Sequence, residues 1–121
     1  MLTITVPGKP LSINRAYKVS RFGSRGGLRK SDEALDYQWR VKVAAKKAMR
    51  GREMLTGDLV LRLVAYWPRR NADSDSPVKL TKDALQGIVF KNDRIVIEDQ
   101  SRRAHDPELP RVEITITRDV A

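Results

Sequence analysis

The sequence contains no cysteine and only one histidine, His105. The absence of cysteine excludes disulfides, thiolate metal sites and cysteine nucleophiles. It also fits a cytoplasmic location, because nothing in the chain depends on an oxidising compartment. His105 stands beside Asp106 and Pro107 in a predicted loop and has no obvious triad partners, so we expect a surface residue rather than a catalyst. A glycine-rich phosphate loop and a dinucleotide fingerprint are missing too.

Long apolar runs are also scarce, and basic residues outnumber acidic ones. The first residues carry neither a positively charged lead nor a long apolar stretch, so we expect no signal peptide and no membrane span. The chain has 24 Lys and Arg against 15 Asp and Glu, a formal net charge of +9. Such a chain is drawn to polyanions, because it neutralises phosphates and releases counterions. Nucleic acid is the leading partner class; an anionic membrane surface is the rival, but no basic amphipathic helix with a strongly apolar face supports it.

The pattern of apolar residues predicts one α+β domain over 1–121. The length of 121 residues fits a single domain, and 40% hydrophobic with 32% charged residues is typical of a folded chain. Periodicity and turn residues predict strands over 2–6, 58–67, 94–100 and 111–118, and helices over 31–50 and 76–86. The order β-α-β-α-β-β indicates a small mixed or antiparallel sheet with two helices packed on it. Ser76 and Pro77 form the predicted start of the second helix, with Pro77 at its first position.

The helix over 31–50 has two apolar stripes. It begins at Ser31, a good N-cap. Its core face is predicted from residues at helical spacing, namely Ala34, Tyr37, Val41, Ala44, Ala45 and Ala48. A second stripe consists of Leu35, Trp39 and Val43. For Trp39 we favour simple packing over a dimer contact or base stacking.

Residues 8–30 predict a long basic loop, mobile when nothing is bound. Seven bases precede the first acid, Asp32: Lys9, Arg15, Lys18, Arg21, Arg25, Arg29 and Lys30. Loops of this length in compact domains are usually functional or disordered. We therefore favour phosphate contacts over a solvated loop that only maintains solubility.

Aspartates offer the best candidate chemistry. Asp73 and Asp75 stand between a predicted strand end and a helix start, and alternate residues of an extended segment point the same way. Asp93 follows the helix, and if the flanking strands are neighbours we expect it at the same end of the sheet. Three carboxylates with open water positions suit Mg²⁺, which activates water for phosphodiester hydrolysis. Lys79 is placed to contact the scissile phosphate, or else to form an i,i+4 ion pair with Asp75 or Asp83.

The stretch from Asp73 to Asp93 resembles the RusA family of Holliday-junction resolvases, common in phages and prophages. The family pattern is Asp-x-Asp-Asn, Lys, Asp-Ala-Leu, a glycine, an aromatic and Asp-Asp. Here the spacing is matched by Asp73, Asp75, Lys79, Asp83-Ala84-Leu85, Gly87, Phe90 and Asp93. Residues 12–17, Ser-Ile-Asn-Arg-Ala-Tyr, are also similar. The departures are Ser76 for the family's asparagine, Asn92 for the first aspartate of the pair, and Pro77 beside the site.

This resemblance implies a homodimeric, Mg²⁺-dependent endonuclease that nicks four-way DNA junctions symmetrically, with Mn²⁺ as a substitute ion. It implies that Asp73, Asp75 and Asp93 bind the metal and that Lys79 assists at the phosphate. The residues then expected near the DNA are Asn14, Arg15, Tyr17, Lys18, Arg69 and Arg70. A two-fold dimer suits symmetric cuts, which need two related active sites.

Two further hypotheses compete with the nuclease. One is a basic, non-catalytic nucleic-acid-binding protein whose acidic cluster is structural or degenerate. The other is an RNA-binding, ribosome-associated protein, but such a protein needs no acids near its basic face. All three bind nucleic acid in a salt-dependent manner. Only the nuclease requires a metal ion for its activity.

Overall fold

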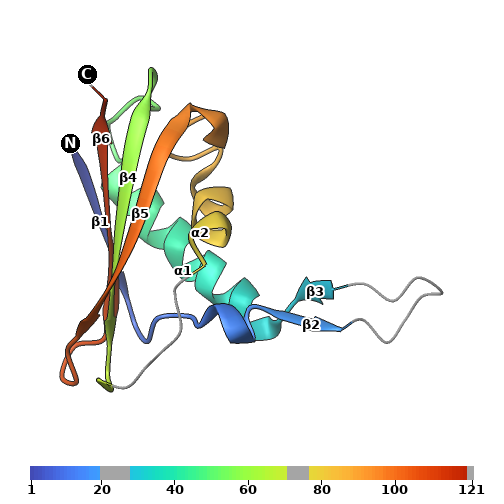
Figure 1. The fold of residues 1–121 in the computed structure, drawn as a ribbon. Helices are drawn as coiled ribbons and strands as arrows, with labels where there is room; N and C mark the ends of the chain where they lie inside the picture. Colours follow the sequence, from blue (N-terminus) through green and yellow to red (C-terminus); the bar gives the residue numbers. More distant parts are fainter. Residues whose placement is uncertain (20–27, 71–76, 120–121) are drawn as a thin grey trace.

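A computed structural model describes residues 1–19, 28–70 and 77–119 of the chain. Its main sheet has four strands in the order β1-β6-β4-β5, and a second sheet pairs β2 with β3 (Figure 1). The strands are β1 (Leu2–Pro7), β2 (Tyr17–Val19), β3 (Leu28–Lys30), β4 (Leu59–Trp67), β5 (Val96–His105) and β6 (Arg111–Arg118). The helices are α1 (Asp32–Ala48) and α2 (Val78–Leu85), with short 3-10 helices η1 (Ile13–Arg15) and η2 (Asp93–Ile95).

The main sheet is mixed, as the sequence predicts. β6 pairs antiparallel with β1 and with β4, whereas β5 pairs parallel to β4. Parallel neighbours need a crossover connection, and α2 provides it between β4 and β5. The predicted α+β fold is therefore confirmed.

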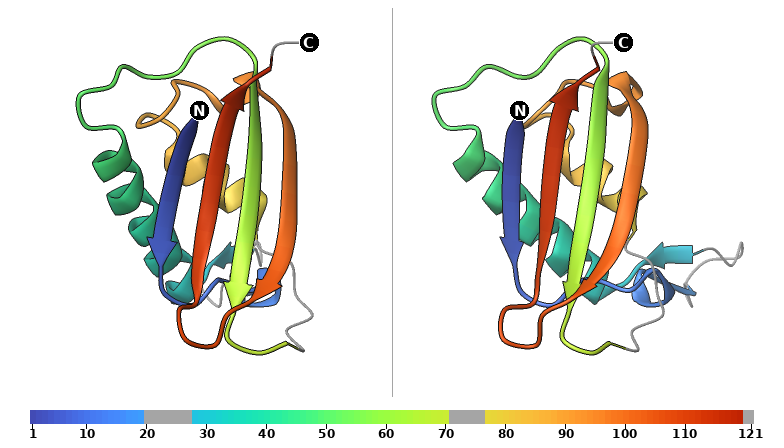
Figure 2. Two further views of the ribbon diagram at one scale, coloured as in Figure 1. Left: turned by 90° about the vertical axis from the view of Figure 1, so that its left-hand side faces the viewer. Right: turned by 60° about the vertical axis from the view of Figure 1, so that its left-hand side comes forward.

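Both helices cover one face of the main sheet and leave the other open (Figure 2). Alternation explains this arrangement: β1 follows the pattern buried, exposed, buried along its length. The buried side chains of the strands include Ile4, Leu61, Leu63 and Ile114. Tyr37 and Val41 of α1, with Leu80 of α2, pack into the same core. The predicted core face of α1 is thus confirmed.

The start of α1 is held by Ser31, as predicted. The Ser31 Oγ accepts a hydrogen bond from the Ala34 backbone N–H at 3.1 Å, and Asp32 and Glu33 occupy the first turn. The same hydroxyl donates to the Arg15 carbonyl oxygen at 2.5 Å. One side chain therefore caps the helix and ties η1 to it.

Several predicted boundaries were wrong. The region 8–30 is not loop throughout, because η1, β2 and β3 form within it; three-residue strands are too short to show a period-2 pattern. β5 reaches His105, so this residue ends a strand instead of lying in a loop, although it is exposed as expected. Pro77 is the N-cap of α2, not its first helical residue. Ser76 lies outside the described residues.

Trp39 is also a correction. Its side chain is 63% exposed, so it does not pack into the core as we expected. Leu35 and Val43, four residues to either side, are 52% and 50% exposed. The reason is the helical period: this stripe points away from the face of α1 that covers the sheet.

Candidate active site

Asp93 lies in a compact turn between α2 and β5. Gly87 has a positive φ of 86°, which ends α2, and its backbone N–H donates to the Phe90 carbonyl oxygen at 2.8 Å. Phe90 and Val89 are fully buried and anchor the turn in the core. The Asp93 backbone N–H donates to Gln86 Oε1 at 2.9 Å. The position of Asp93 is therefore fixed by the buried residues Val89 and Phe90 before it and by the hydrogen bond from its backbone to Gln86.

The side chains around Asp93 are polar. Asn92 caps η2 by accepting from the Arg94 backbone N–H at 3.0 Å. Asp93 itself is partly exposed. Among the described residues its carboxylate has no hydrogen bond or ion pair, so it is available to an incoming ligand. Sequence reasoning missed Gln86 and Asn92 as supports, because side-chain caps of this kind depend on the geometry of the turn.

Lys79 lies in the first turn of α2 and points to solvent. Its side chain is 78% exposed, and its Nζ is 3.8 Å from Asp83 Oδ1. This is one of the two ion pairs considered for Lys79 from the sequence. A pair this exposed contributes little to stability and leaves the ammonium group accessible to an anion.

The parallel crossover corrects the expected position of Asp93. β4 and β5 are neighbours, as the expectation required, but Leu59 pairs with Val96 and Trp67 pairs with His105. Asp93, which precedes Val96, therefore lies at the end of the sheet where β4 begins, not at the end where it finishes. Lys79 lies in the first turn of α2 and Asp93 follows the other end of this helix, whose eight residues span about 12 Å.

Asp73 and Asp75 lie outside the described residues. Within residues 1–19, 28–70 and 77–119 there is no group of three or more acidic or histidine side chains that could hold a metal ion. Two of the three predicted ligands lie outside these ranges. The assignment of the three aspartates as ligands therefore stays a prediction.

The predicted DNA contacts Asn14, Arg15, Tyr17 and Lys18 gather on a basic arm, which we define as η1, β2 and β3. Lys18 pairs with Arg29, and Tyr17 pairs with Lys30. In Figure 1 the strands β2 and β3 project away from the sheet and helices. Asn14, Arg15 and Tyr17 are exposed. Arg29 and Lys30, on the second strand of the arm, belong to the predicted basic loop but were not among the individually named DNA contacts.

The root of the basic arm is fixed. Ala16 is fully buried, and its carbonyl oxygen accepts from the Ser31 backbone N–H at 3.0 Å. Arg15 also faces Glu33 of α1, with 3.7 Å between Nη1 and Oε1, although both side chains are mostly exposed. The arm is therefore attached to the start of α1, while Arg15 and Arg29 remain exposed.

Arg69 and Arg70 follow β4 and are exposed. They lie at the end of the sheet where Trp67 pairs with His105, and the same end carries Pro7, the last residue of β1. The chain enters the basic arm from this end. The structure thus places the predicted DNA contacts toward one end of the sheet and Asp93 at the other.

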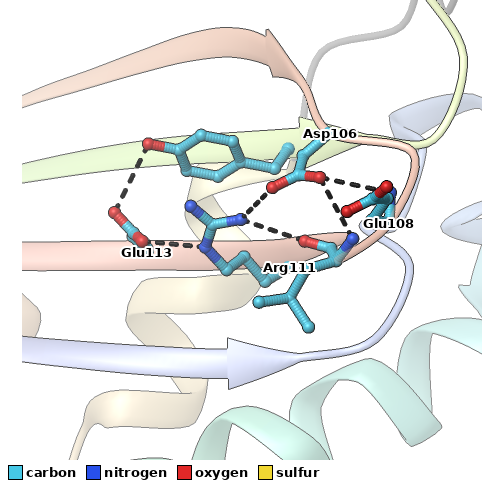
Figure 3. Close-up of polar contacts among 6 residues, drawn as sticks. Asp106, Glu108, Arg111 and Glu113 are labelled. Atoms are coloured by element: carbon cyan, nitrogen blue, oxygen red, sulfur yellow. Dashed lines mark hydrogen bonds and ion pairs between the residues drawn. The ribbon is translucent and has the colours of Figure 1, made fainter.

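One arginine near that end is structural. Arg111 donates to Asp106 and Glu113, each at 2.8 Å, and its guanidinium lies 3.7 Å from the centroid of the Tyr66 ring (Figure 3). The Arg111 side chain holds the pKa of Asp106 below its usual value, with help from the Leu109 backbone N–H. The carboxylates of Asp106 and Glu113 in turn raise the pKa of Arg111. These contacts stabilise the β5–β6 turn, and because the Arg111 guanidinium is already paired with two carboxylates it is not a good candidate for a phosphate contact.

The described residues thus form an α+β domain with a projecting basic arm and an aspartate, Asp93, whose carboxylate has no partner among them. The family model described as endodeoxyribonuclease RusA matches residues 7–117. The chain therefore belongs to the RusA endodeoxyribonuclease family, as the resemblance of its central motif indicated. The search of curated proteins produced no match. Among the described residues, no helix has the length and apolar character needed to cross a membrane.

Proposed function

We propose that this protein is a Mg²⁺-dependent endonuclease that resolves four-way DNA junctions by paired symmetric nicks. The observation that carries the proposal is the match of the RusA model to nearly the whole chain, residues 7–117. The spacing of Asp73, Asp75, Lys79 and Asp93 supports it, because these residues fall on the family's motif.

The proposed metal ligands are Asp73, Asp75 and Asp93. Carboxylate oxygens are the ligands that Mg²⁺ prefers. The free carboxylate of Asp93 fits this role, since no described residue competes for it. When bound, the ion would position and polarise a water molecule for attack and would stabilise negative charge on the phosphodiester.

The remaining roles belong to the cations. Lys79 is proposed to offset negative charge on the scissile phosphate, which its 78% exposure permits. The proposed DNA contacts are Asn14, Arg15, Tyr17, Lys18, Arg69 and Arg70. Phosphate contacts of this kind position the DNA, so recognition of a junction rests on shape rather than on base sequence.

The test is a gel assay of a labelled synthetic four-way junction with Mg²⁺ and with excess chelator. We expect paired symmetric nicks from the wild type that need the metal. Asp73→Asn, Asp75→Asn and Asp93→Asn should abolish nicking while keeping or tightening junction binding, since each removes a charge that repels phosphate. Glu108→Gln, which removes a carboxylate from the β5–β6 turn, is the matched control and should cut normally.

Binding without any cutting, with Mn²⁺ or with duplex and flap substrates included, would favour a non-catalytic binding protein instead.

If the wild type cuts, a mixture of Asp75→Asn and Asp93→Asn chains tells which subunit supplies Asp93 to an active site. Recovered nicking assigns a site shared between two chains. An inactive mixture, in chains shown to exchange, assigns all three aspartates to one chain.

A further inference from the structure

The segment that leads from β1 into the basic arm is held by one side chain of α1, Arg40. Its Nη1 donates to the Pro7 carbonyl oxygen at 2.8 Å, and its Nη2 donates to the Lys9 carbonyl oxygen at 3.1 Å. Its Nε donates to Asp36 Oδ2, one turn earlier on α1, at 3.2 Å. All three nitrogens of the guanidinium are therefore engaged, and only 27% of the side chain is exposed.

Gly8, between the two bonded carbonyls, leaves room for this guanidinium. Its φ of 101° lies in the region that glycine adopts without strain, and its backbone N–H donates to the Pro110 carbonyl oxygen at 3.2 Å. A Cβ at this position would stand 2.6 Å from Arg40 Nη1, which is closer than real Cβ atoms come. Any larger residue would therefore strain the backbone and displace the guanidinium. We call this contact, between the Arg40 guanidinium and the backbone of residues 7–9, the Arg40 clamp.

The Arg40 clamp is the second polar attachment of the basic arm to α1. The first is Ser31, which binds the backbone of Arg15 and Ala16 at the start of the helix. Ser31 and Arg40 are nine residues apart, which is about 13 Å along the helix axis. Leu11, between the two attachments, is buried in the core, but apolar packing does not set a direction. Two attachments at this distance fix the direction in which the arm projects (Figure 1), whereas one alone would let it pivot.

The direction of the arm decides which shapes of DNA its cations can contact together. Phosphate contacts fix the position of a protein on DNA without reading the base sequence. A duplex presents the same backbone along its whole length, so exposed cations find phosphates in many registers. A four-way junction presents phosphates at fixed angles around one point, so only cations held in matching positions contact several of them at once.

We infer that Arg40 is a positioning residue for junction recognition: it holds the backbone of residues 7–9 and thereby fixes the direction of the basic arm. Arg40 does not itself contact phosphate, because Asp36 offsets its charge and two backbone carbonyls bind its other nitrogens. The inference rests on the proposed function in one respect, since it takes a four-way junction as the substrate. The clamp itself is assigned from hydrogen bonds and steric fit.

The test compares binding of the full chain to a labelled four-way junction and to a labelled duplex of the same length, by fluorescence anisotropy in excess chelator. Arg40→Lys and Gly8→Ala leave the net charge unchanged, so the duplex affinity should stay the same. The junction affinity should fall about tenfold, because binding then has to order a segment that the clamp no longer holds. Lysine cannot replace the clamp, since its ammonium is a point charge without the planar fork of arginine. Partial unfolding would lower both affinities alike and leave their ratio unchanged.

Two control variants make the same exchanges elsewhere in the chain. Gly51→Ala introduces a Cβ at a φ of 72° with no described atom within 4 Å beyond its chain neighbours, so it strains the backbone without displacing a side chain. Arg50→Lys exchanges an exposed arginine just beyond the end of α1. Both should keep the wild-type ratio of junction to duplex affinity. The double variant Arg40→Ala, Gly8→Ala should bind junctions as Arg40→Ala alone does, because both changes act through one contact.

Hydrogen exchange tests the attachment without DNA. The backbone amides of residues 8–19 should exchange faster in Arg40→Lys and in Gly8→Ala than in the wild type, because this segment opens more easily once the clamp is lost. Gly51→Ala and Arg50→Lys should leave exchange in this segment unchanged.

Unchanged exchange in both clamp variants would overturn the inference, and so would a ratio of junction to duplex affinity equal to that of the wild type. A wild type without preference for the junction would overturn it as well. Equal losses for junction and duplex in Arg40→Ala, with full affinity in Arg40→Lys, would instead make Arg40 a direct phosphate contact. Because binding is measured without metal, a chain that binds junctions and never cuts them fails only the proposed nuclease.

Discussion

The contact between α1 and α2 can be tested at two consecutive buried hydrogen bonds that link Tyr37, Thr81 and the Pro77 carbonyl. The Tyr37 hydroxyl and Thr81 Oγ1 are 2.8 Å apart, and both residues are fully buried. Thr81 Oγ1 also donates to the Pro77 carbonyl oxygen at 3.1 Å. Because threonine has one hydroxyl proton, the Tyr37 hydroxyl must donate to Thr81. Burial raises the pKa of Tyr37, which keeps this donor protonated.

Tyr37→Phe removes one donor and leaves the proton of Thr81 satisfied. We expect a loss of about 1 kcal/mol in the free energy of unfolding. Thr81→Val is more costly, at about 2 kcal/mol, because the Tyr37 hydroxyl is left buried without an acceptor. In both variants the Pro77 carbonyl oxygen still accepts the hydrogen bond from the Thr81 backbone N–H, which is 3.1 Å long. In the double variant no orphaned hydroxyl remains, so its cost should fall short of the sum by about 1 kcal/mol.

The assay is urea unfolding of the four proteins, followed by circular dichroism. Thermal unfolding provides a check, with a shift of about 4 °C per kcal/mol for a chain of this size. If the losses in the free energy of unfolding of the two single variants sum to that of the double variant within about 0.3 kcal/mol, the two hydrogen bonds are not coupled and the reasoning is refuted. A Thr81→Val variant more stable than Tyr37→Phe would refute it too.

Three further predictions concern pH, salt and the turn before β5. The pKa of Asp106 is lowered in the folded state, so its contribution to the free energy of unfolding is present above the ordinary carboxyl pKa and is lost as the pH falls through the folded value. Asp106→Asn should therefore reduce the loss of stability at acid pH, measured as the urea midpoint against pH. Lys18→Ala should weaken junction binding about equally for all sequences and reduce the slope of log K against log salt by about 1; an unchanged slope in titrations would remove Lys18 from the phosphate contacts. Gln86→Ala should lower nicking about tenfold at unchanged junction affinity, because the Asp93 backbone N–H loses its 2.9 Å hydrogen bond to the Gln86 side chain. Gln86→Glu keeps an acceptor at this position and should keep most of the activity. Equal losses in both variants would contradict a positioning role for Gln86.

Local pattern predicted most of the regular elements. Alternation located β1 and β6, and the N-cap Ser31 located the start of α1 to the residue. These features depend on neighbours within a few positions, so they are readable in one sequence. The three-residue strands β2 and β3 were missed because their pairing depends on the attachment of Ala16 to Ser31, fifteen positions away.

The sequence alone determined the family, the basic charge and the identity of the candidate groups. The motif from Asp73 to Asp93 pointed to the family that the match over residues 7–117 then showed. Composition predicted a polyanion partner, because a net charge of +9 does not depend on how the chain folds.

Only the tertiary structure decided where those groups lie. A crossover through α2 makes β5 parallel to β4, and this puts Asp93 at the end of the sheet where β4 begins. An antiparallel return would have put it at the other end, and the residues of the strands are compatible with both. The exposure of Trp39 was likewise decided by packing: α1 has two apolar stripes, and the sheet has room to bury only one of them.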